Sequence, residues 1–219
     1  CQFVIPDGVT LTIEPGTVVK SFDTGVTVAA GGVLTAVGTG EAPVVFTDWR
    51  DDTVGGDTNG DGNDSTPENG SADAILLGQS EGSWQQTSQQ VTLTHVNMRY
   101  VNPVTSYNYD NRSSKLAQVR ITDSRFVAQD DVPGDPHASI TCQDATVTGS
   151  TFTGVALNLS YCDADLSNNT FEHADVHVSH SPDLSGIDLS GDAANTFTGT
   201  PARRTLTTFK SMVPAGTTW

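Results

Sequence analysis

The sequence predicts an all-β protein: a right-handed parallel β-helix solenoid that carries an inserted calcium-binding loop. Three observations lead to this fold class. A short motif recurs at about the length of one coil, the segments that carry it have a β-type composition, and an acidic Gly- and Asn-rich insertion interrupts the series.

The recurring motif starts with an aliphatic residue followed by Thr or Ser, and it ends five positions later on a large apolar residue. It occurs at 93–98, 121–126, 147–152 and 166–171, and a frayed copy ends at Phe197. The closing apolar positions are 28, 26, 19 and 26 residues apart. A period of roughly 20–30 residues is typical of a solenoid, in which each unit buries its apolar face only against its neighbours.

The units are β-strands rather than helices. Val, Ile, Thr and Phe dominate them, Gly and Asn separate them, and long helical stripes are missing. In the front half, 9–13 and 26–28 read as short alternating strands, with apolar residues inward and Thr, Ser or Asp outward. A parallel β-helix of roughly eight coils fits best. A β-sandwich remains the alternative, since turn-separated strands also suit that class.

Length and charge limit the function. The 219 residues suffice for one domain spanning 1–219, and acidic residues outnumber basic ones 26 to 10, for a formal charge of −16. Such a charge repels nucleic acids and anionic membranes and attracts divalent cations. No apolar run approaches the roughly 20 residues of a membrane span.

The insertion, at about residues 51–70, contains a calcium-loop pattern, D-x-[DN]-x-[DN]-G-x5-E. Oxygen ligands at alternate positions converge on one hard cation, Gly62 supplies the sharp turn, and the final Glu closes the shell. The expected calcium ligands are Asp57, Asn59, Asp61, Asn63 and Glu68.

This loop does not belong to an EF-hand pair. Helix-forming segments are missing on both sides, and position 8, usually apolar, is Asp64. We therefore expect a lone calcium loop between strands. A plain acidic turn is the alternative, because Gly, Asn and Asp also form simple loops.

Cysteine spacing matches the coil. Cys142 and Cys162 are 20 residues apart, about one coil, and neighbouring parallel strands lie ~4.8 Å apart, within the Cα range of a disulfide. Both a disulfide and a stack of buried thiols fit. The odd count leaves at least one thiol, such as Cys1, free or intermolecular.

A resemblance extends this interpretation. The segments 5–20, 32–39 and 43–47, followed by the acidic insertion, resemble a recurring module of large bacterial surface and secreted proteins. These proteins belong to the pectin-lyase-like, right-handed β-helix group. The tail 213–219 resembles the run-up to another module, so the resemblance implies one unit of a longer exported chain. Relatives often have a Trp-Gly-rich strand after the insertion, where this chain has 72–77.

Carboxylates are the first catalytic candidates. Asp130 and Asp131, with Asp135 and His137 nearby, could share acid and base roles in glycoside hydrolysis. The same segment reads equally well as a solvated turn.

Basic and aromatic residues give weaker signals. Arg99, Arg120 and Arg125 lie on successive units, where a lyase would need cations, but their registers differ. Tyr107 and Tyr109 could stack on sugar rings, or they could pack on their own coil.

Histidines form a third pattern. His173, Asp175 and His177 alternate along one expected strand, which would place them on one face ~6.7 Å apart, with His180 as a fourth ligand if the chain turns. Exposed positions alternating with Val are the plain explanation.

We therefore expect a non-enzymatic, calcium-stabilised structural or adhesive module that is secreted or held at the cell surface. It would assemble end to end into a fibre, since the open ends of a β-helix are unpaired strand edges. The expected partners are calcium ions, copies of the chain or adjacent modules, and glycans. A polysaccharide lyase or glycoside hydrolase on the same fold is the alternative, because the fold alone does not fix the function.

Overall fold

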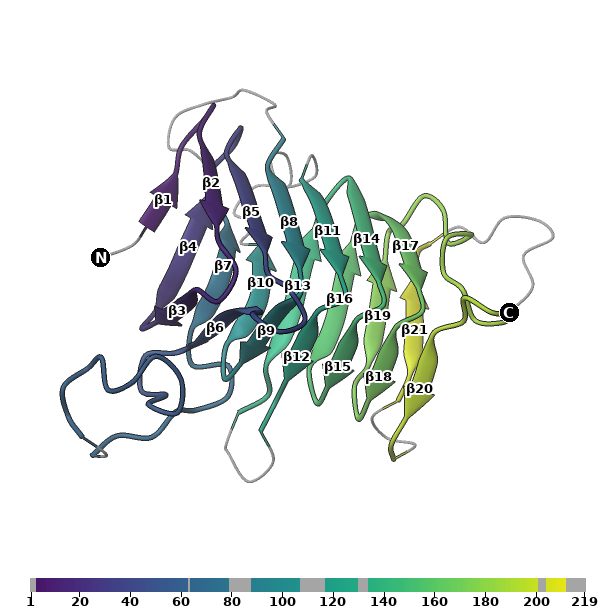
Figure 1. Ribbon diagram of the computed structural model, residues 1–219. Coiled ribbons are helices and arrows are strands. Elements are labelled where there is room, and N and C mark those ends of the chain that lie inside the picture. The colour runs from purple at the N-terminus through teal and green to yellow at the C-terminus, as the bar shows by residue number, and fades with distance from the viewer. Residues whose placement is uncertain are drawn as a thin grey trace.

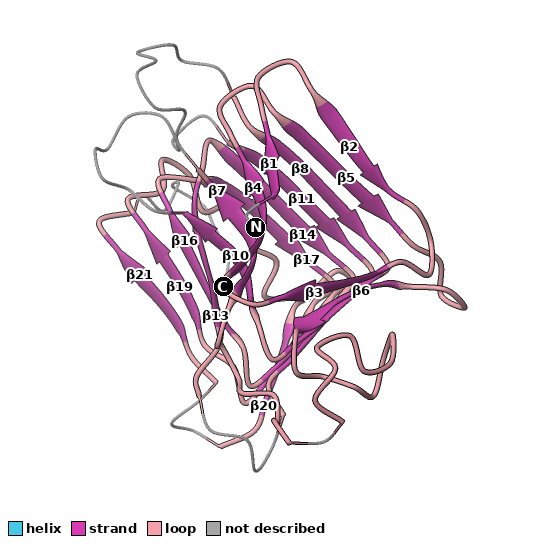
Figure 2. Cartoon of the chain, turned by 90° about the vertical axis from the view of Figure 1, so that its left-hand side faces the viewer, coloured by secondary structure: helices cyan, strands magenta, loops and turns pink. Residues whose placement is uncertain are grey.

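The computed structural model describes residues 3–62, 64–78, 88–106, 117–129, 134–200 and 204–211. These residues form strands and contain no helix, so none of them belongs to a helix that could cross a membrane. The strands form three parallel sheets, and the chain visits the sheets in turn as it coils (Figures 1 and 2).

Sheet A has eight strands and borders the longest connections. In spatial order they are β1 (Phe3–Ile5), β4 (Thr24–Val28), β7 (Asp73–Leu77), β10 (Asn102–Ser106), β13 (His137–Thr141), β16 (Ala156–Ser160), β19 (Val176–Ser179) and β21 (Leu206–Phe209).

Sheet B has six strands and lies at the front of Figure 1. From the N-terminal end they are β2 (Thr10–Ile13), β5 (Val33–Val37), β8 (Gln90–Thr94), β11 (Gln118–Thr122), β14 (Asp144–Thr148) and β17 (Asp163–Ser167).

Sheet C has seven strands and closes the coil. They are β3 (Val18–Ser21), β6 (Val44–Asp48), β9 (Val96–Arg99), β12 (Arg125–Val127), β15 (Thr151–Thr153), β18 (Thr170–Glu172) and β20 (Thr196–Thr198).

This architecture confirms the predicted parallel β-helix. Every strand pair within the described ranges is parallel, which excludes the antiparallel sandwich. The strands expected at 9–13 and 26–28 are β2 and β4.

The repeated motif forms a ladder through the core. Its closing residues stand in register on adjacent strands of sheet C. The rings of the four phenylalanines among them stack with centroids 4.6, 5.1 and 5.0 Å apart, and the first four members of the ladder are fully buried. The ladder consists of Met98, Phe126, Phe152, Phe171 and Phe197.

A second ladder, of polar residues, lies at the corner between sheets B and C. Ser124, Ser150, Asn169 and Asn195 are buried there at successive coils. Each accepts a hydrogen bond from the backbone N–H of the coil before it; the Ser150 N–H, for example, donates to Asn169 Oδ1 over 2.9 Å. Because the corner turns sharply, its backbone groups leave the sheet ladders, and these side chains supply the missing partners.

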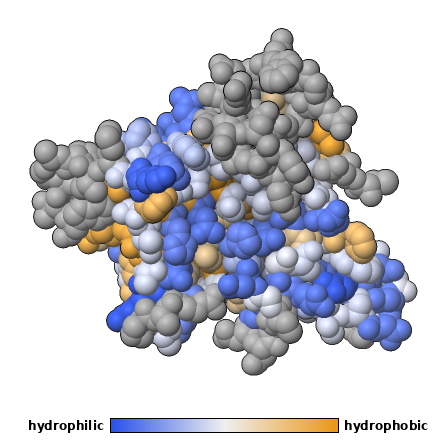
Figure 3. All heavy atoms as spheres, turned by 180° about the vertical axis from the view of Figure 1, so that it is seen from behind, coloured by the Kyte–Doolittle hydropathy of each residue, from blue (hydrophilic) through white to orange (hydrophobic). Residues whose placement is uncertain are grey.

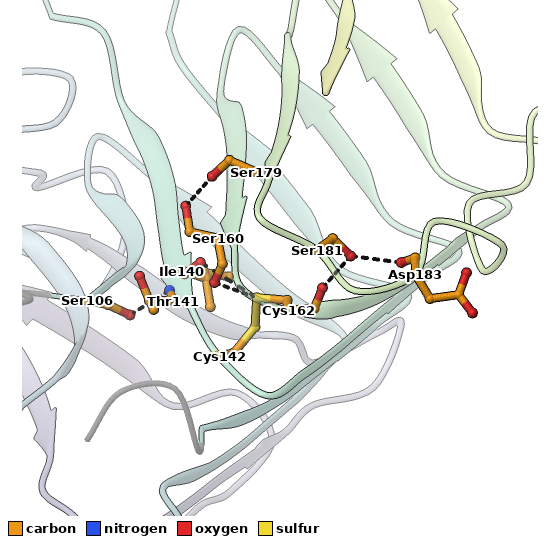
Figure 4. Close-up of a disulfide and its surroundings, with 9 residues drawn as sticks. All are labelled: Ser106, Ile140, Thr141, Cys142, Ser160, Cys162, Ser179, Ser181 and Asp183. Carbon is orange, nitrogen blue, oxygen red and sulfur yellow. Dashed lines mark hydrogen bonds between the residues drawn. A yellow bond between two sulfur atoms is a disulfide. The ribbon is translucent and has the colours of Figure 1, made fainter. Parts of the chain in front are cut away.

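The corner between sheets A and B contains the disulfide. Cys142 and Cys162 are bonded, with Cα atoms 4.8 Å apart on neighbouring coils (Figure 4). One coil further on, the Ser181 hydroxyl donates to the Cys162 carbonyl over 2.7 Å. This settles the choice between a disulfide and a thiol stack. Cys1 lies outside the described residues.

The two ends of the coil differ at sheet B, whereas β20 and β21 at the C-terminal side each pair with one strand only, like the strands at the other end. At the C-terminal side Ile187 pairs with Leu166 of β17, and Leu184 and Ile187 are buried over the core. At the other end β1, β2 and β3 each pair with one strand only. Figure 3 shows the side opposite sheet B, where hydrophilic residues predominate and hydrophobic groups are most evident near the two ends.

Candidate metal centre

The acidic insertion connects β6 of sheet C to β7 of sheet A and loops out from the coil, at the lower left of Figure 1. It therefore spans residues 49–72, close to the predicted 51–70. Five left-handed glycines turn the backbone inside it, among them Gly60 (φ 75°) and Gly62 (φ 72°) within the calcium-loop pattern.

Asp51 fixes the start of the insertion to the coil. Its carboxylate is fully buried, and Oδ2 accepts hydrogen bonds from the Thr47 hydroxyl at 2.6 Å and Arg99 Nε at 2.8 Å. Oδ1 accepts from the Thr53 hydroxyl at 2.6 Å. Burial alone would raise the pKa of Asp51, but the hydrogen bonds and the Arg99 charge together hold that pKa below its usual range.

Asp48 ties the start of the insertion to its end. Arg50 donates to both carboxylate oxygens, from Nε at 3.0 Å and from Nη2 at 2.8 Å, and the Ser71 hydroxyl donates to Oδ2. Burial raises the pKa of Asp48, yet these hydrogen bonds outweigh it and leave the pKa lowered. The base of the insertion is thus closed by two buried carboxylates with full sets of donors.

Three carboxylates meet inside the insertion. Oxygen atoms of Asp52, Asp57 and Asp61 all lie within 4.8 Å of one another. Asp57 also shapes the loop, because it accepts hydrogen bonds from the N–H groups of Gly60 at 2.7 Å and Gly62 at 2.9 Å. These backbone donors, Gly62 first, lower the pKa of Asp57.

Two oxygens of this cluster are left without a hydrogen-bond donor. Asp52 Oδ1 and Asp61 Oδ1 are both shielded from solvent and have no hydrogen-bond partner. A buried carboxylate oxygen without a donor is costly, and it is the arrangement that a bound cation would satisfy.

Lys20 reaches the same cluster from β3. Its side chain is 9 % exposed, its Nζ lies 3.8 Å from Asp52 Oδ1, and it donates to the Gly56 carbonyl over 2.5 Å. Three carboxylates and one ammonium leave a formal charge of −2, which one divalent ion would neutralise. The donor set is all oxygen, as calcium and magnesium prefer.

The predicted ligands are brought together only in part. Asp57 and Asp61 belong to the cluster. The Asn59 amide donates to the Ser65 hydroxyl over 3.2 Å, and Glu68 lies 3.4 Å from Arg50 with its side chain 60 % exposed. Asn63 lies outside the described residues.

Asp52 is the member of the cluster that the sequence pattern does not predict. It precedes the twelve-residue pattern, so no motif position points to it. The only signal was the acidic pair Asp51-Asp52 at the start of the insertion, where the first residue turns inward to Arg99 and the second faces the cluster.

The structure favours the plain explanation of the histidine pattern over a metal site, since His177 is exposed between the buried Val176 and Val178. His173 bends the chain after β18 with φ 49°, and of the predicted ligands only His177 lies in β19. Asp175 precedes β19 and accepts hydrogen bonds from the N–H and hydroxyl of Thr205 at 2.8 and 2.7 Å. His180 stacks on a neighbouring tyrosine. Because the strand breaks at the corner, alternation along the sequence does not place these side chains on one face.

The three arginines do not align, as expected. Arg99 is committed to Asp51, Arg120 lies on sheet B, and Arg125 is in register with Asn97 rather than with Arg99.

The remaining catalytic and aromatic candidates are only partly described. His137 Nδ1 lies 3.3 Å from the backbone carbonyl of Asp135. Asp130, Asp131, Tyr107 and Tyr109 lie outside the described residues.

Comparison with known proteins adds no identification: no family model, no curated protein and no solved structure matches the chain. The structure has the parallel coiled architecture expected from the resemblance of the opening segments. The function of the site must be inferred from its own geometry.

Proposed function

We propose that the protein is a non-enzymatic, calcium-stabilised β-helix module with a structural or adhesive role outside the cell. The observation that carries this proposal is the cluster of Asp52, Asp57 and Asp61, with two buried oxygens that lack a donor.

Calcium suits the cluster better than other common ions. The ligands are hard oxygens on a loop, without the histidine or cysteine that zinc or copper favour. Calcium accepts six to eight oxygens in flexible geometry, whereas magnesium demands a near-ideal octahedron and keeps several waters. Loop carbonyls and water could complete a calcium shell.

The ion would act by fixing the insertion to the coil. Asp52 directly follows Asp51, which forms an ion pair with Arg99 of β9. Asp52 itself forms an ion pair with Lys20 of β3. A cation bound to Asp52 and to the two loop carboxylates would therefore connect the far part of the insertion to a rigid base. Stabilisation then follows from preferential binding to the folded state.

An oxidising, extracellular setting is supported by the Cys142–Cys162 disulfide. Assembly is supported by the unpaired strand edges and exposed apolar residues at the N-terminal end of the coil. There, three strand edges are unpaired, and Phe3, Val4, Val9 and Phe22 are 54, 46, 45 and 72 % exposed. A further coil, from an adjacent module or another copy, would cover both.

Thermal unfolding with calcium, magnesium or excess chelator tests the proposal. We expect calcium to raise the unfolding temperature, with a gain of about 2.7 kcal/mol at a hundredfold excess over Kd, and magnesium to do less. Asp61→Asn should remove most of this gain, whereas Asp64→Asn, an exposed carboxylate of the same insertion, should keep it. Equal unfolding temperatures in calcium and chelator would exclude the site.

A further inference from the structure

The dipeptide Asn-Gly occurs twice in the chain, at 59–60 and at 69–70, and both copies lie in the insertion between β6 and β7 (Figure 1). In this dipeptide the backbone nitrogen of the glycine can attack the side-chain amide carbon of the asparagine, because glycine has no side chain to hinder the approach. The two copies share this chemistry and differ only in their surroundings. The structure therefore indicates which of them can react.

The coil holds the second copy in place. Asn69 is 6 % exposed, its Nδ2 donates to the Gln129 carbonyl over 2.9 Å, and its Oδ1 accepts from the Gln129 N–H at 3.1 Å. A Cβ on Gly70 would lie 3.2 Å from Asn102 Oδ1 and 3.4 Å from Pro136, so the glycine is packed as well. Attack at this copy requires the hydrogen bonds and the packing to open first.

The first copy is held only by its own loop. Asn59 is half-buried, and Gly60 is exposed, with open space where a Cβ would stand. The Asn59 amide donates to the Ser65 hydroxyl over 3.2 Å, and its Oδ1 accepts from the Asp61 N–H at 3.5 Å. Both partners belong to the insertion, so a movement of the loop can bring the amide carbon to the Gly60 nitrogen without opening the coil.

The attacking nitrogen also faces an acceptor. The Gly60 N–H donates to Asp57 Oδ1 over 2.7 Å. The proton that the nitrogen must lose thus already points at a carboxylate within hydrogen-bond reach, which is the arrangement that assists such an attack.

We propose that Asn59 is a self-modification site, at which the folded insertion converts this asparagine into isoaspartate and aspartate. The Gly60 nitrogen forms a bond to Asn59 Cγ and the bond from Cγ to Nδ2 breaks. The proton of the Gly60 nitrogen passes by way of water to the departing amide, which leaves as ammonia. Water then opens the cyclic imide at either carbonyl, and nothing is oxidised or reduced.

The conversion changes the metal centre. Each product adds a carboxylate between Asp57 and Asp61 in the sequence, and isoaspartate also lengthens the backbone that leads from Asp57 to its donors Gly60 and Gly62. A cation bound to the cluster would restrain the loop and slow the attack. This protection rests on the proposed calcium site, whereas the conversion itself does not.

Incubation of the full chain at neutral pH with excess chelator tests the proposal, and fragment-ion mass spectrometry locates the modified residue. We expect Asn59 to convert at least about tenfold faster than Asn69, because Asn69 must first lose its hydrogen bonds to Gln129. In urea that unfolds the chain, the two rates should approach each other, since the dipeptide is the same. Calcium in place of chelator should slow the conversion of Asn59.

Asn59→Gln is the matched variant, because the longer side chain disfavours the cyclic imide. It should remove the signal at this position, and its unfolding temperature in chelator should equal that of the unmodified chain. The proposal is overturned if Asn59 stays unmodified in the folded chain while it converts in urea, or if Asn69 converts as fast as Asn59 in the folded chain.

The calcium arm has its own outcomes. Equal rates at Asn59 with calcium and with chelator would overturn the protection alone. The shift of the unfolding temperature with calcium tests the calcium site separately, so failure of that site and failure of the modification are distinguishable.

Discussion

Asp52 occupies the place in the carboxylate cluster that the sequence pattern assigns to Glu68. The pattern places Glu68 at the closing position, yet Asp52 is the residue that joins Asp57 and Asp61, while Glu68 pairs with Arg50. A residue outside the motif can thus take a ligand position when the fold brings it near.

We predict that Asp52→Asn abolishes more of the calcium stabilisation than Glu68→Gln does. Loss of one carboxylate from the cluster should weaken calcium binding at least about tenfold, or about 1.4 kcal/mol. Calcium titration followed by the unfolding temperature measures both variants. A larger effect of Glu68→Gln would restore the ligand set of the sequence pattern.

Asp51 makes the free energy of unfolding depend on pH in the acidic range. Its folded pKa is lowered, so its stabilising charge is fully present above the unfolded value of about 3.9 and is lost as the pH falls through the folded pKa. Asp48 shifts in the same direction and adds to the effect. Stability should therefore decline below about pH 5.

Asp51→Asn should cost about 3–5 kcal/mol at pH 7, because it leaves Arg99 without its buried partner. Urea unfolding at steps from pH 7 to pH 3 checks this, and the cost should shrink toward acid. Asp165→Asn, at an exposed position of β17, serves as the control. An unchanged cost at pH 3 would contradict the assignment.

At the scale of elements, successive corners between sheets B and C combine a left-handed residue, such as Asp123, Gly149 or Asn168, with a buried polar residue directly after it. At one corner Asn168 has φ 56°, and the next residue, Asn169, donates to the Val147 carbonyl at 2.7 Å and to Asn195 Oδ1 at 2.9 Å. The corner therefore depends on side-chain hydrogen bonds that link one coil to the next.

Asn169→Ala should lower the free energy of unfolding by about 3 kcal/mol or more, since each buried polar group left unpaired costs about 1–3 kcal/mol. Asn168→Gly is the matched control in the same corner, because glycine accepts a positive φ without strain. Chemical unfolding of the two variants distinguishes them, and equal costs would show that the buried ladder is not the stabilising feature.

At the scale of the whole molecule, the disulfide reduces the conformational entropy of the unfolded chain. It closes a loop with a sequence separation of 20 residues, so its removal should cost about 3 kcal/mol. The double variant Cys142→Ser, Cys162→Ser should therefore unfold at a lower temperature, as should the unmodified chain in reductant.

The calcium gain should survive loss of the disulfide, because the bond joins the coils of β13 and β16 whereas the carboxylate cluster lies in the insertion between β6 and β7. Calcium titration of the double variant measures this. A gain that disappears with the disulfide would mean that the two features stabilise one cooperative element rather than independent parts of the coil.

The sequence by itself predicted the parallel coil and the ladder of large apolar residues, and it placed Cys142 and Cys162 one coil apart; the structure decided for the disulfide over the thiol stack. Stacked coils place equivalent positions about one strand spacing apart, so a period along the chain becomes a contact in space. Only the tertiary structure decided the membership of Asp52, the approach of Lys20 and the dispersal of the histidines. These depend on how an insertion folds back on β3 and on where a corner bends the chain, and neither follows from spacing in the sequence.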